Sequence, residues 1–399
     1  MHYTDAVVSV PPQIAAVLPL FDGVHSLLDI QEAFARRFGT LIFREQLLGV
    51  IRSLDEHLLL DSPRFADHRT RLEEEFRRAP DRPARLAGMS YPAEPEALRA
   101  ELGGYFTVDG GPGNASPKAL AGRLTGLLVP HIDFARGGPC YAWGYRQLAD
   151  VLPVDRWVIL GTVHAPIGRP FALTRKDFGT PLGSAGVDRE CMEALIDRVG
   201  EEYLEDEFAH RGEHSIEFQC VFLRHLVPAG HSLRIVPILC GSFHRFVEEG
   251  RVPGPGNTVE DFLGVLSEVL AAQGGRTIIL ASADLTHVGP QFSDPRPVSP
   301  GQLREIEAAD LEMLGSVEAG DAKAFFHAVA RDGDRRRICG LPPVYAMLRV
   351  LGGCQGRLLR YAQWPDPNGT VTFAALALYA PDGSDHRQRQ ERLRSSGAG

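Results

Sequence analysis

The chain has 399 residues, of which 44% are hydrophobic and 23% charged, with a formal net charge of -9 at pH 7. That composition is ordinary for a globular protein, and its acidic balance excludes a general nucleic-acid binder, because phosphate binding needs an excess of basic residues. No apolar run approaches the roughly 20 residues of a membrane span, and no basic-then-apolar signal pattern opens the chain, so we expect a cytoplasmic protein without a membrane partner.

Residues 1–62 predict a small winged-helix-like α+β module. Apolar residues recur at helical spacing in three segments, and Leu58–Leu60 predicts a short strand or wing after the third. The segment resembles the PqqD-like family, the RiPP recognition elements, at Leu20–Gly23, Ser26–Ile30, Phe38–Gly39 and the closing Leu54 and Leu58–Leu60. In that family an extended peptide adds to a sheet edge, so the resemblance implies a peptide or protein partner for residues 1–62. The alternative is a structural or dimerisation wing without a ligand.

The sequence pattern after residue 62 predicts a connector, a larger domain and a tail. Residues 63–86 carry mixed charges at three- and four-residue spacing, which predicts an exposed helical linker. Residues 87–381 alternate apolar strand-like runs with helical periodicity, which predicts an α/β domain with a mixed or mostly parallel sheet and helices on both faces. Residues 382–399 are polar, basic and rich in Gly and Ser, and we expect this tail to be disordered.

Three of the predicted strands deliver a histidine at their carboxyl end. Leu127–Pro130 precedes His131, Arg156–Val163 precedes His164, and Thr277–Thr286 precedes His287. In an open α/β sheet, ligands bind outside the carboxyl ends of the strands. The pattern therefore predicts that the imidazoles converge on a metal or proton-transfer site.

A fourth histidine opens a predicted helix. His214 lies in the run Gly212–Glu217, in which Ser215 or Glu213 can cap the helix. Glu217 follows His214 by three residues and falls on the same helical face, so the two side chains are expected to share a proton or orient each other. The alternative for any one of these histidines is a structural role.

From residue 87 to 380 the chain resembles the Memo family, whose bacterial members include protein B of the AmmeMemoRadiSam system. Eight motifs carry the resemblance in order: Ala87–Tyr91, Pro130–His131, Ile159–His164, Glu213–Glu217, Val236–Leu239, Ser282–Gly289, Ile338–Gly340 and Tyr361–Gln363. The resemblance implies a fold similar to class III extradiol dioxygenases, which hold iron(II) with two histidines and a carboxylate. In the Memo pattern a cysteine replaces the carboxylate.

The resemblance implies His131, His164 and Cys339 as metal ligands, and His214 and His287, with Asp284 beside them, as the residues lining the cavity. Together with Glu217, which helical spacing places near His214, these are the candidate catalytic groups: His214, His287, Asp284 and Glu217. Two imidazoles and a thiolate favour iron(II) most, with copper or zinc as alternatives. A thiolate ligand requires that Cys339 lose its proton, which Arg335–Arg337 would favour, although these residues also read as an exposed basic run.

Three departures from the family pattern alter the expected pocket. Ile132–Phe134 replaces the usual Ala-Gly-Tyr, Ala165 stands where a second histidine is common, and Arg211 stands where an acidic residue is usual. Asp133 is either a turn cap or an additional ligand or base.

We therefore expect a metal-dependent redox enzyme, dioxygenase-like, acting on a small aromatic compound or a peptide residue. One alternative is a non-catalytic metal- or peptide-binding scaffold acting with a radical-SAM partner, and a weaker one is a zinc hydrolase.

Overall fold

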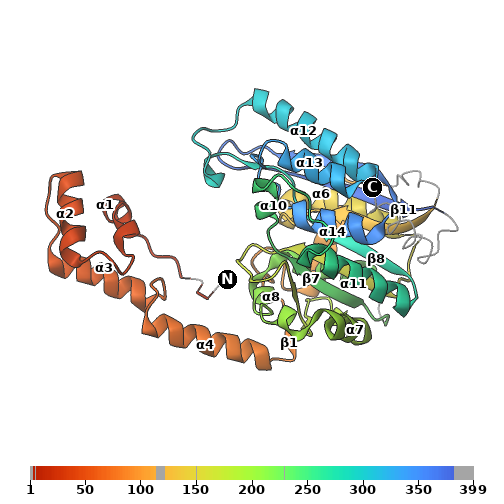
Figure 1. Cartoon of the computed structure of the whole chain (residues 1–399), viewed down its shortest axis with the longest axis horizontal. Helices are drawn as coiled ribbons and strands as arrows, with labels where there is room; N and C mark the ends of the chain where they lie inside the picture. The colour runs from red at the N-terminus through yellow and green to blue at the C-terminus, as the bar shows by residue number, and fades with distance from the viewer. Residues whose placement is uncertain (1–2, 5, 114–121, 150, 229, 382–399) are drawn as a thin grey trace. The chain divides into compact units, whose positions relative to one another are not determined.

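The computed structural model describes residues 3–4, 6–113, 122–149, 151–228 and 230–381. The chain divides into two compact units, Met1–Arg78 and Ala79–Gly399 (Figure 1). This boundary falls inside the charged segment 63–86, whose first part is the helix α4 (Pro63–Arg78). The tail 382–399 that we expect to be disordered lies outside the described residues. Within those residues, none of the helices is both long and apolar enough to cross a membrane.

The first unit, residues 1–78, is built from helices around a small core. Besides α4 it contains α1 (Pro12–Ala15), α2 (Leu27–Phe38), α3 (Arg44–Glu56) and the 3₁₀ turn η1 (Leu18–Leu20). A capping box between Ser26 and Asp29 starts α2, and Gly39 ends it in the left-handed conformation at φ 68°. The core residues are Ile14, Val17, Ile30, Phe34, Ile42 and Leu47.

The predicted wing at Leu58–Leu60 is wrong: of residues 3–4 and 6–78, none belongs to a strand. These residues close α3 instead, because the N–H of Leu58 donates to Asp55 O at 3.0 Å and that of Leu59 to Leu54 O at 2.9 Å. This pair of bonds is a helix C-terminal motif that normally has Gly at the left-handed position. Here Leu58 occupies it at φ 62°, so the usual signal is missing from the sequence. The unit is helical rather than α+β, and it presents no described sheet edge.

In the described part of the second unit the centre is a nine-stranded mixed sheet, with strand order β10-β11-β2-β8-β3-β7-β4 and two short strands off that path. The four central strands β2, β8, β3 and β7 are parallel, and β11 and β4 flank them antiparallel. At the edge, β10 pairs antiparallel with β11. The strands of the unit, including a separate β1–β5 pair, are β1 (Asp81–Arg82), β2 (Arg123–Val129), β3 (Arg156–Thr162), β4 (Phe171–Leu173), β5 (Asp177–Phe178), β6 (Gly186–Val187), β7 (Arg234–Cys240), β8 (Thr277–Ser282), β9 (His287–Val288), β10 (Gln355–Trp364) and β11 (Thr370–Ala380).

Helices cover both faces of the sheet (Figure 1). On one face, α6 packs against β2, β10 and β11, and α9 packs against β3 and β8. On the other face, α14 packs against β2, β8 and β3, and α11 and α13 pack against α14. The helices are α5 (Pro95–Gly104), α6 (Phe134–Tyr145), α7 (Arg189–Val199), α8 (Ala209–Gly212), α9 (His214–Leu226), α10 (His244–Glu248), α11 (Thr258–Gln273), α12 (Pro300–Glu318), α13 (Ala322–Ala330) and α14 (Leu341–Leu351), with 3₁₀ turns η2 (Arg146–Leu148), η3 (Glu201–Leu204) and η4 (Pro290–Phe292).

The predicted α/β fold is confirmed. β3 is buried at every position and β2 at all but its first, as expected for parallel strands covered on both faces. Each fully buried Leu, Ile or Val contributes about 1.5–3 kcal/mol relative to an exposed one. This buried sheet is the rigid support from which the histidine-bearing loops emerge.

Candidate metal centre

The carboxyl ends of β2, β8 and β3 lie at one level. Ser282 at the end of β8 pairs with Val129 of β2 and with Gly161 of β3. The loops that follow therefore start side by side, and they bring His131 and His164 together as the sequence predicts. His214, the first residue of α9, joins them.

The three histidines form a compact cluster in which one ligand atom from each lies within 4.8 Å of the others. The rings of His164 and His214 are stacked at 4.7 Å, and the ring of His131 meets both edge-on at 5.1 and 5.2 Å. His131 is buried, whereas 43% of the His164 side chain is exposed. The cluster thus has a closed side at His131 and an open side at His164.

Cys339 and Asp284 complete the inner side of the cluster. The Sγ of Cys339 lies 3.3 Å from Nε2 of His131, and its thiol donates to the backbone carbonyl of Asp284 at 3.5 Å. The Asp284 carboxylate accepts from the backbone N–H of His131 at 3.0 Å and lies 3.6 Å from its Nε2. The predicted ligands Cys339 and His131 are therefore neighbours, and Asp284 holds the loop that presents His131.

Acceptor-only partners orient all three imidazoles. Nδ1 of His131 lies 3.0 Å from the carbonyl oxygen of Ser282, and Nδ1 of His164 and of His214 each lies 3.1 Å from the Glu213 carboxylate. An oxygen that only accepts places the proton of a neutral ring on Nδ1, so the lone pair is on Nε2 in each ring. Metal-ligating histidines are oriented in this way in proteins, so the donor set fits a bound metal ion.

Burial decides the protonation states at the inner side. Burial lowers the pKa of His131 to about 3, so this ring is neutral at pH 7. Burial, followed by the charge of Asp284, raises the pKa of the Cys339 thiol well above its usual range. Without a metal the thiol therefore keeps its proton, and thiolate ligation would release it. Burial alone would lower the pKa of His164, but the hydrogen bond and charge of Glu213 outweigh it and raise the pKa.

Glu213 is the residue that joins these parts. As the N-cap of α9 its carboxylate accepts from the backbone N–H groups of His214 and Ser215 at 2.8 and 3.1 Å, and it also accepts from the backbone N–H of His164 at 2.8 Å. Its pKa lies well below the usual range although burial opposes this, because His164 and His214 both bond to it. Sequence reasoning considered Glu213 only as a cap. The run Glu-His-Ser at a helix start was the available signal.

A glycine lets α9 approach β3 closely enough for this arrangement. A Cβ atom at Gly161 would lie 2.6 Å from Ser215 Oγ and 2.7 Å from Ile216 Cγ1, which are both too short. The Ser215 hydroxyl instead donates to the backbone carbonyl of Thr162 at 2.8 Å. The start of α9 is thereby fixed against the end of β3.

His287 lies at the margin of the cluster. Its Nδ1 is 3.0 Å from the carbonyl oxygen of Leu285 and 3.2 Å from that of Arg337, and burial lowers its pKa. The preceding residue, Thr286, donates to the buried carboxylate of Asp310 at 2.8 Å. His287 is therefore held with Nε2 available, as a proton-transfer group requires.

The arginines before Cys339 have other partners than the thiol. Arg336 pairs with buried Asp310, and Arg337 pairs with Asp294 at 2.7 Å. Arg335 is exposed. Burial and the charge of Asp284 raise the pKa of Cys339, and none of these arginines is among the main groups that shift it.

Glu217 does not join His214, so the predicted pairing of these two side chains is wrong. Its buried carboxylate pairs with buried Arg82, accepts from the hydroxyl of Tyr91, and accepts from the backbone N–H of Leu86 at 2.9 Å. Glu217 thereby fixes residues 82–91, near the start of the second unit, to α9. Asp133 caps α6 by accepting from the N–H of Arg136 at 3.1 Å, which is the turn-capping alternative.

Comparison with known proteins agrees with the motif order. The family model described as Memo-like protein matches residues 82–374. The chain belongs to this family. A MEMO1 family protein of Aquifex aeolicus is 28% identical over 92% of this chain and 91% of its own length. A second, from Methanopyrus kandleri, is 30% identical over 75% of this chain and 99% of its own length, and a third, from Thermus thermophilus, is 29% identical over 84% and 93%.

These matches differ in how much of the first unit they include. Residues 79–399 make up about 80% of the chain. The Aquifex and Thermus matches are longer than that share, so both include part of residues 1–78. The Methanopyrus relative aligns over nearly its whole length to 75% of the chain, a share slightly smaller than that of the second unit alone. Memo-like proteins thus occur at both sizes.

Proposed function

We propose that the second unit is a metal-dependent redox enzyme of the class III extradiol dioxygenase type, with non-haem iron held by His131, His164 and Cys339. The observation that carries this proposal is the common orientation of the imidazoles, whose Nδ1 atoms all face acceptor-only oxygens. Nitrogen and sulfur donors favour iron(II), copper or zinc over magnesium. Iron bound by three ligands would supply a redox centre with open positions for O₂ and an organic substrate.

The other residues of the cluster would position ligands and transfer protons. Asp284 fixes the His131 loop through the backbone N–H of that residue. Glu213 holds His164 and His214 in one orientation and supports their basicity. His214, on the open side, and His287, at the margin, are the groups suited to accept or return a substrate proton.

The test is elemental analysis of the full chain purified without oxygen, beside Cys339→Ala, His214→Ala and a His131→Ala, His164→Ala double variant. We expect near-stoichiometric iron in the unmodified chain, loss of most metal in the double variant and in Cys339→Ala, and retention in His214→Ala. Normal metal content in Cys339→Ala, with loss in His214→Ala, would make the three histidines the ligand set.

The same measurement separates the alternatives. Stoichiometric zinc, with hydrolysis of ester or amide substrates and no O₂ uptake, would replace the redox proposal by a hydrolase. Absence of metal from every preparation would leave a binding scaffold as the function of the unit.

We further propose that residues 1–78 bind a peptide or protein partner, of which a radical-SAM protein is the candidate. Large apolar side chains support this proposal, since Leu28, Leu41 and Phe43 are between 66% and 74% exposed. Because the unit has no described sheet edge, the contact would be made by helices and their connections rather than by strand addition. Co-purification of the full chain with the organism's radical-SAM protein, beside a Leu28→Ser, Leu41→Ser variant, tests this. Equal recovery with both chains would contradict it.

A further inference from the structure

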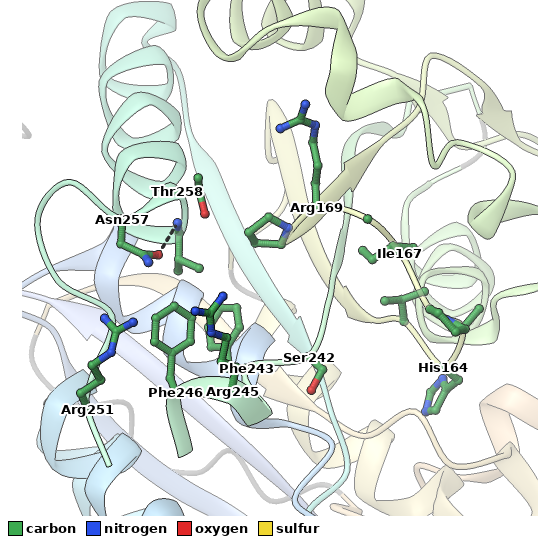
Figure 2. A pocket seen from close by; sticks show the side chains of 16 residues that line it. His164, Ile167, Arg169, Ser242, Phe243, Arg245, Phe246, Arg251, Asn257 and Thr258 are labelled. Atoms are coloured by element: carbon green, nitrogen blue, oxygen red, sulfur yellow. Dashed lines mark hydrogen bonds between the residues drawn. The ribbon is translucent and has the colours of Figure 1, made fainter. Parts of the chain in front are cut away.

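A cavity of about 820 Å³ opens beside the metal centre, with His164 at its margin (Figure 2). Its walls come from the loop after β3 (residues 163–170), the segment after β7 (residues 242–251) and the start of α11. These segments follow the carboxyl ends of adjacent parallel strands, where α/β sheets bind their ligands. The exposed side of the His164 ring therefore faces a volume large enough for a small organic molecule.

The lining of this cavity is positively charged, although the whole chain is acidic. The lining includes Arg169, Arg245 and Arg251, and among the described residues that line it none is Asp or Glu. Arg245 and Arg251 share a single carboxylate, that of Glu249, while Arg169 lies 3.9 Å from Glu202. Two guanidinium groups on one carboxylate leave an excess positive charge.

Arg169 also has a donor that lacks a partner. Its Nε is buried and makes no hydrogen bond within the described part of the chain. Because that Nε is closed to solvent, a ligand in the cavity would contact the terminal guanidinium nitrogens of Arg169, whose side chain is 38% exposed. The guanidinium is held over the ring of Tyr203 at 5.5 Å, so its position is set before a ligand arrives.

The remaining walls suit the apolar body of such a ligand. Phe243, Phe246 and Ile167 line the cavity, and Arg251 lies over the Phe246 ring at 5.2 Å. Asn257 caps the 16-residue helix α11 by accepting from the N–H of Val259 at 2.9 Å (Figure 2). The positive end of that helix dipole adds to the attraction for an anion.

We infer that this cavity binds an organic anion, with a carboxylate or phosphate held by the arginines and an apolar body against Phe243 and Phe246. The inference rests on the proposed function, because it makes this molecule the substrate whose far end reaches the metal side of His164. Planar guanidinium groups suit both anions, because a carboxylate and a phosphate each have two oxygens that can accept a bidentate pair of hydrogen bonds.

The inference is tested by titration calorimetry on the full chain from which metal has been removed. Three probes are compared: 3-phenylpropionate, its neutral analogue 3-phenylpropionamide, and phenyl phosphate. We expect both anions to bind and the amide to bind at least 10-fold more weakly. Hydrogen bonds to charged groups contribute about 1.5–3 kcal/mol, so Arg169→Gln and Arg251→Gln should each raise the Kd of the preferred anion about 10- to 100-fold. The tighter of the two anions identifies the charged group of the natural ligand.

Arg331→Gln is the matched control, because Arg331 is an exposed, ion-paired arginine that does not line the cavity. It should leave every Kd unchanged. Equal binding of the amide and the anions, or equal losses in all three arginine variants, would overturn the inference. Because the assay contains no metal, loss of the proposed metal site would leave this result unaffected, and failure of anion binding would leave the metal proposal standing.

Discussion

Replacing Glu213 by glutamine tests whether the carboxylate between two histidines sets the affinity of the proposed metal centre. In the structure the carboxylate accepts from three backbone N–H groups and faces Nδ1 of both His164 and His214. An amide keeps the size but loses the charge, and its NH₂ group would face N–H donors. Loss of such a partner behind metal-ligating histidines lowers metal affinity about 10- to 100-fold, or about 1.4–2.8 kcal/mol.

The assay is anaerobic competition with a chelator of known affinity, run on the unmodified chain and on Glu213→Gln. Loss of the helix cap will also lower stability by about 1 kcal/mol, which thermal unfolding measures separately. Glu94→Gln is the control, because Glu94 caps α5 in the same way by accepting from the N–H of Ala97 at 2.8 Å. If both variants lose stability and neither loses metal affinity, Glu213 is only a cap and the reasoning fails.

Three further outcomes are expected. Glu217→Leu will lower the free energy of unfolding by about 3–5 kcal/mol in denaturant titration, because Arg82 would be left buried without its counter-charge, and it will leave metal content unchanged. A chain of residues 79–399 will fold and bind metal as the full chain does, by circular dichroism and elemental analysis, and aggregation would contradict this. Burial lowers the pKa of His210 to about 3 from 6.5, so the unfolded state binds its proton more readily. That contribution to stability is therefore complete above pH 6.5 and lost as pH falls toward 3, and His210→Gln should flatten the pH dependence of unfolding.

The sequence allowed prediction of the site wherever strand geometry alone decides position. Parallel strands end at one level, and His131 after β2 and His164 after β3 do meet. His287 was expected to converge with them, but it comes five residues after the end of β8 and lies at the margin of the cluster. Cys339 was reached through the family motif, because no local pattern relates it to those strands. It lies near them because the segment before α14 packs against the loop after β8, where the N–H of Gly340 donates to Asp284 O at 3.1 Å.

Helix periodicity was a weaker guide. It assigned His214 and Glu217 to one face of α9, but a first-turn residue projects beyond the helix end while one a turn later points into packed structure. Glu217 consequently meets Arg82, which is 135 residues earlier in the chain and carries no local signal of the contact. The prediction of a wing was wrong for a related reason. Leu58 adopts the left-handed backbone conformation, which a leucine in the sequence does not indicate.

Gly161 carries no reactive group, yet it limits how this protein can be redesigned. A library that varies only the histidines and Cys339 would leave untouched the contact that brings α9 to β3, whereas any larger residue at position 161 would strike Ser215 and Ile216. Such a substitution would move apart the stacked rings of His164 and His214, although both histidines would still be present. In sequence searches for members of this fold with the same site, glycine at that strand position is therefore as informative as the proposed ligands.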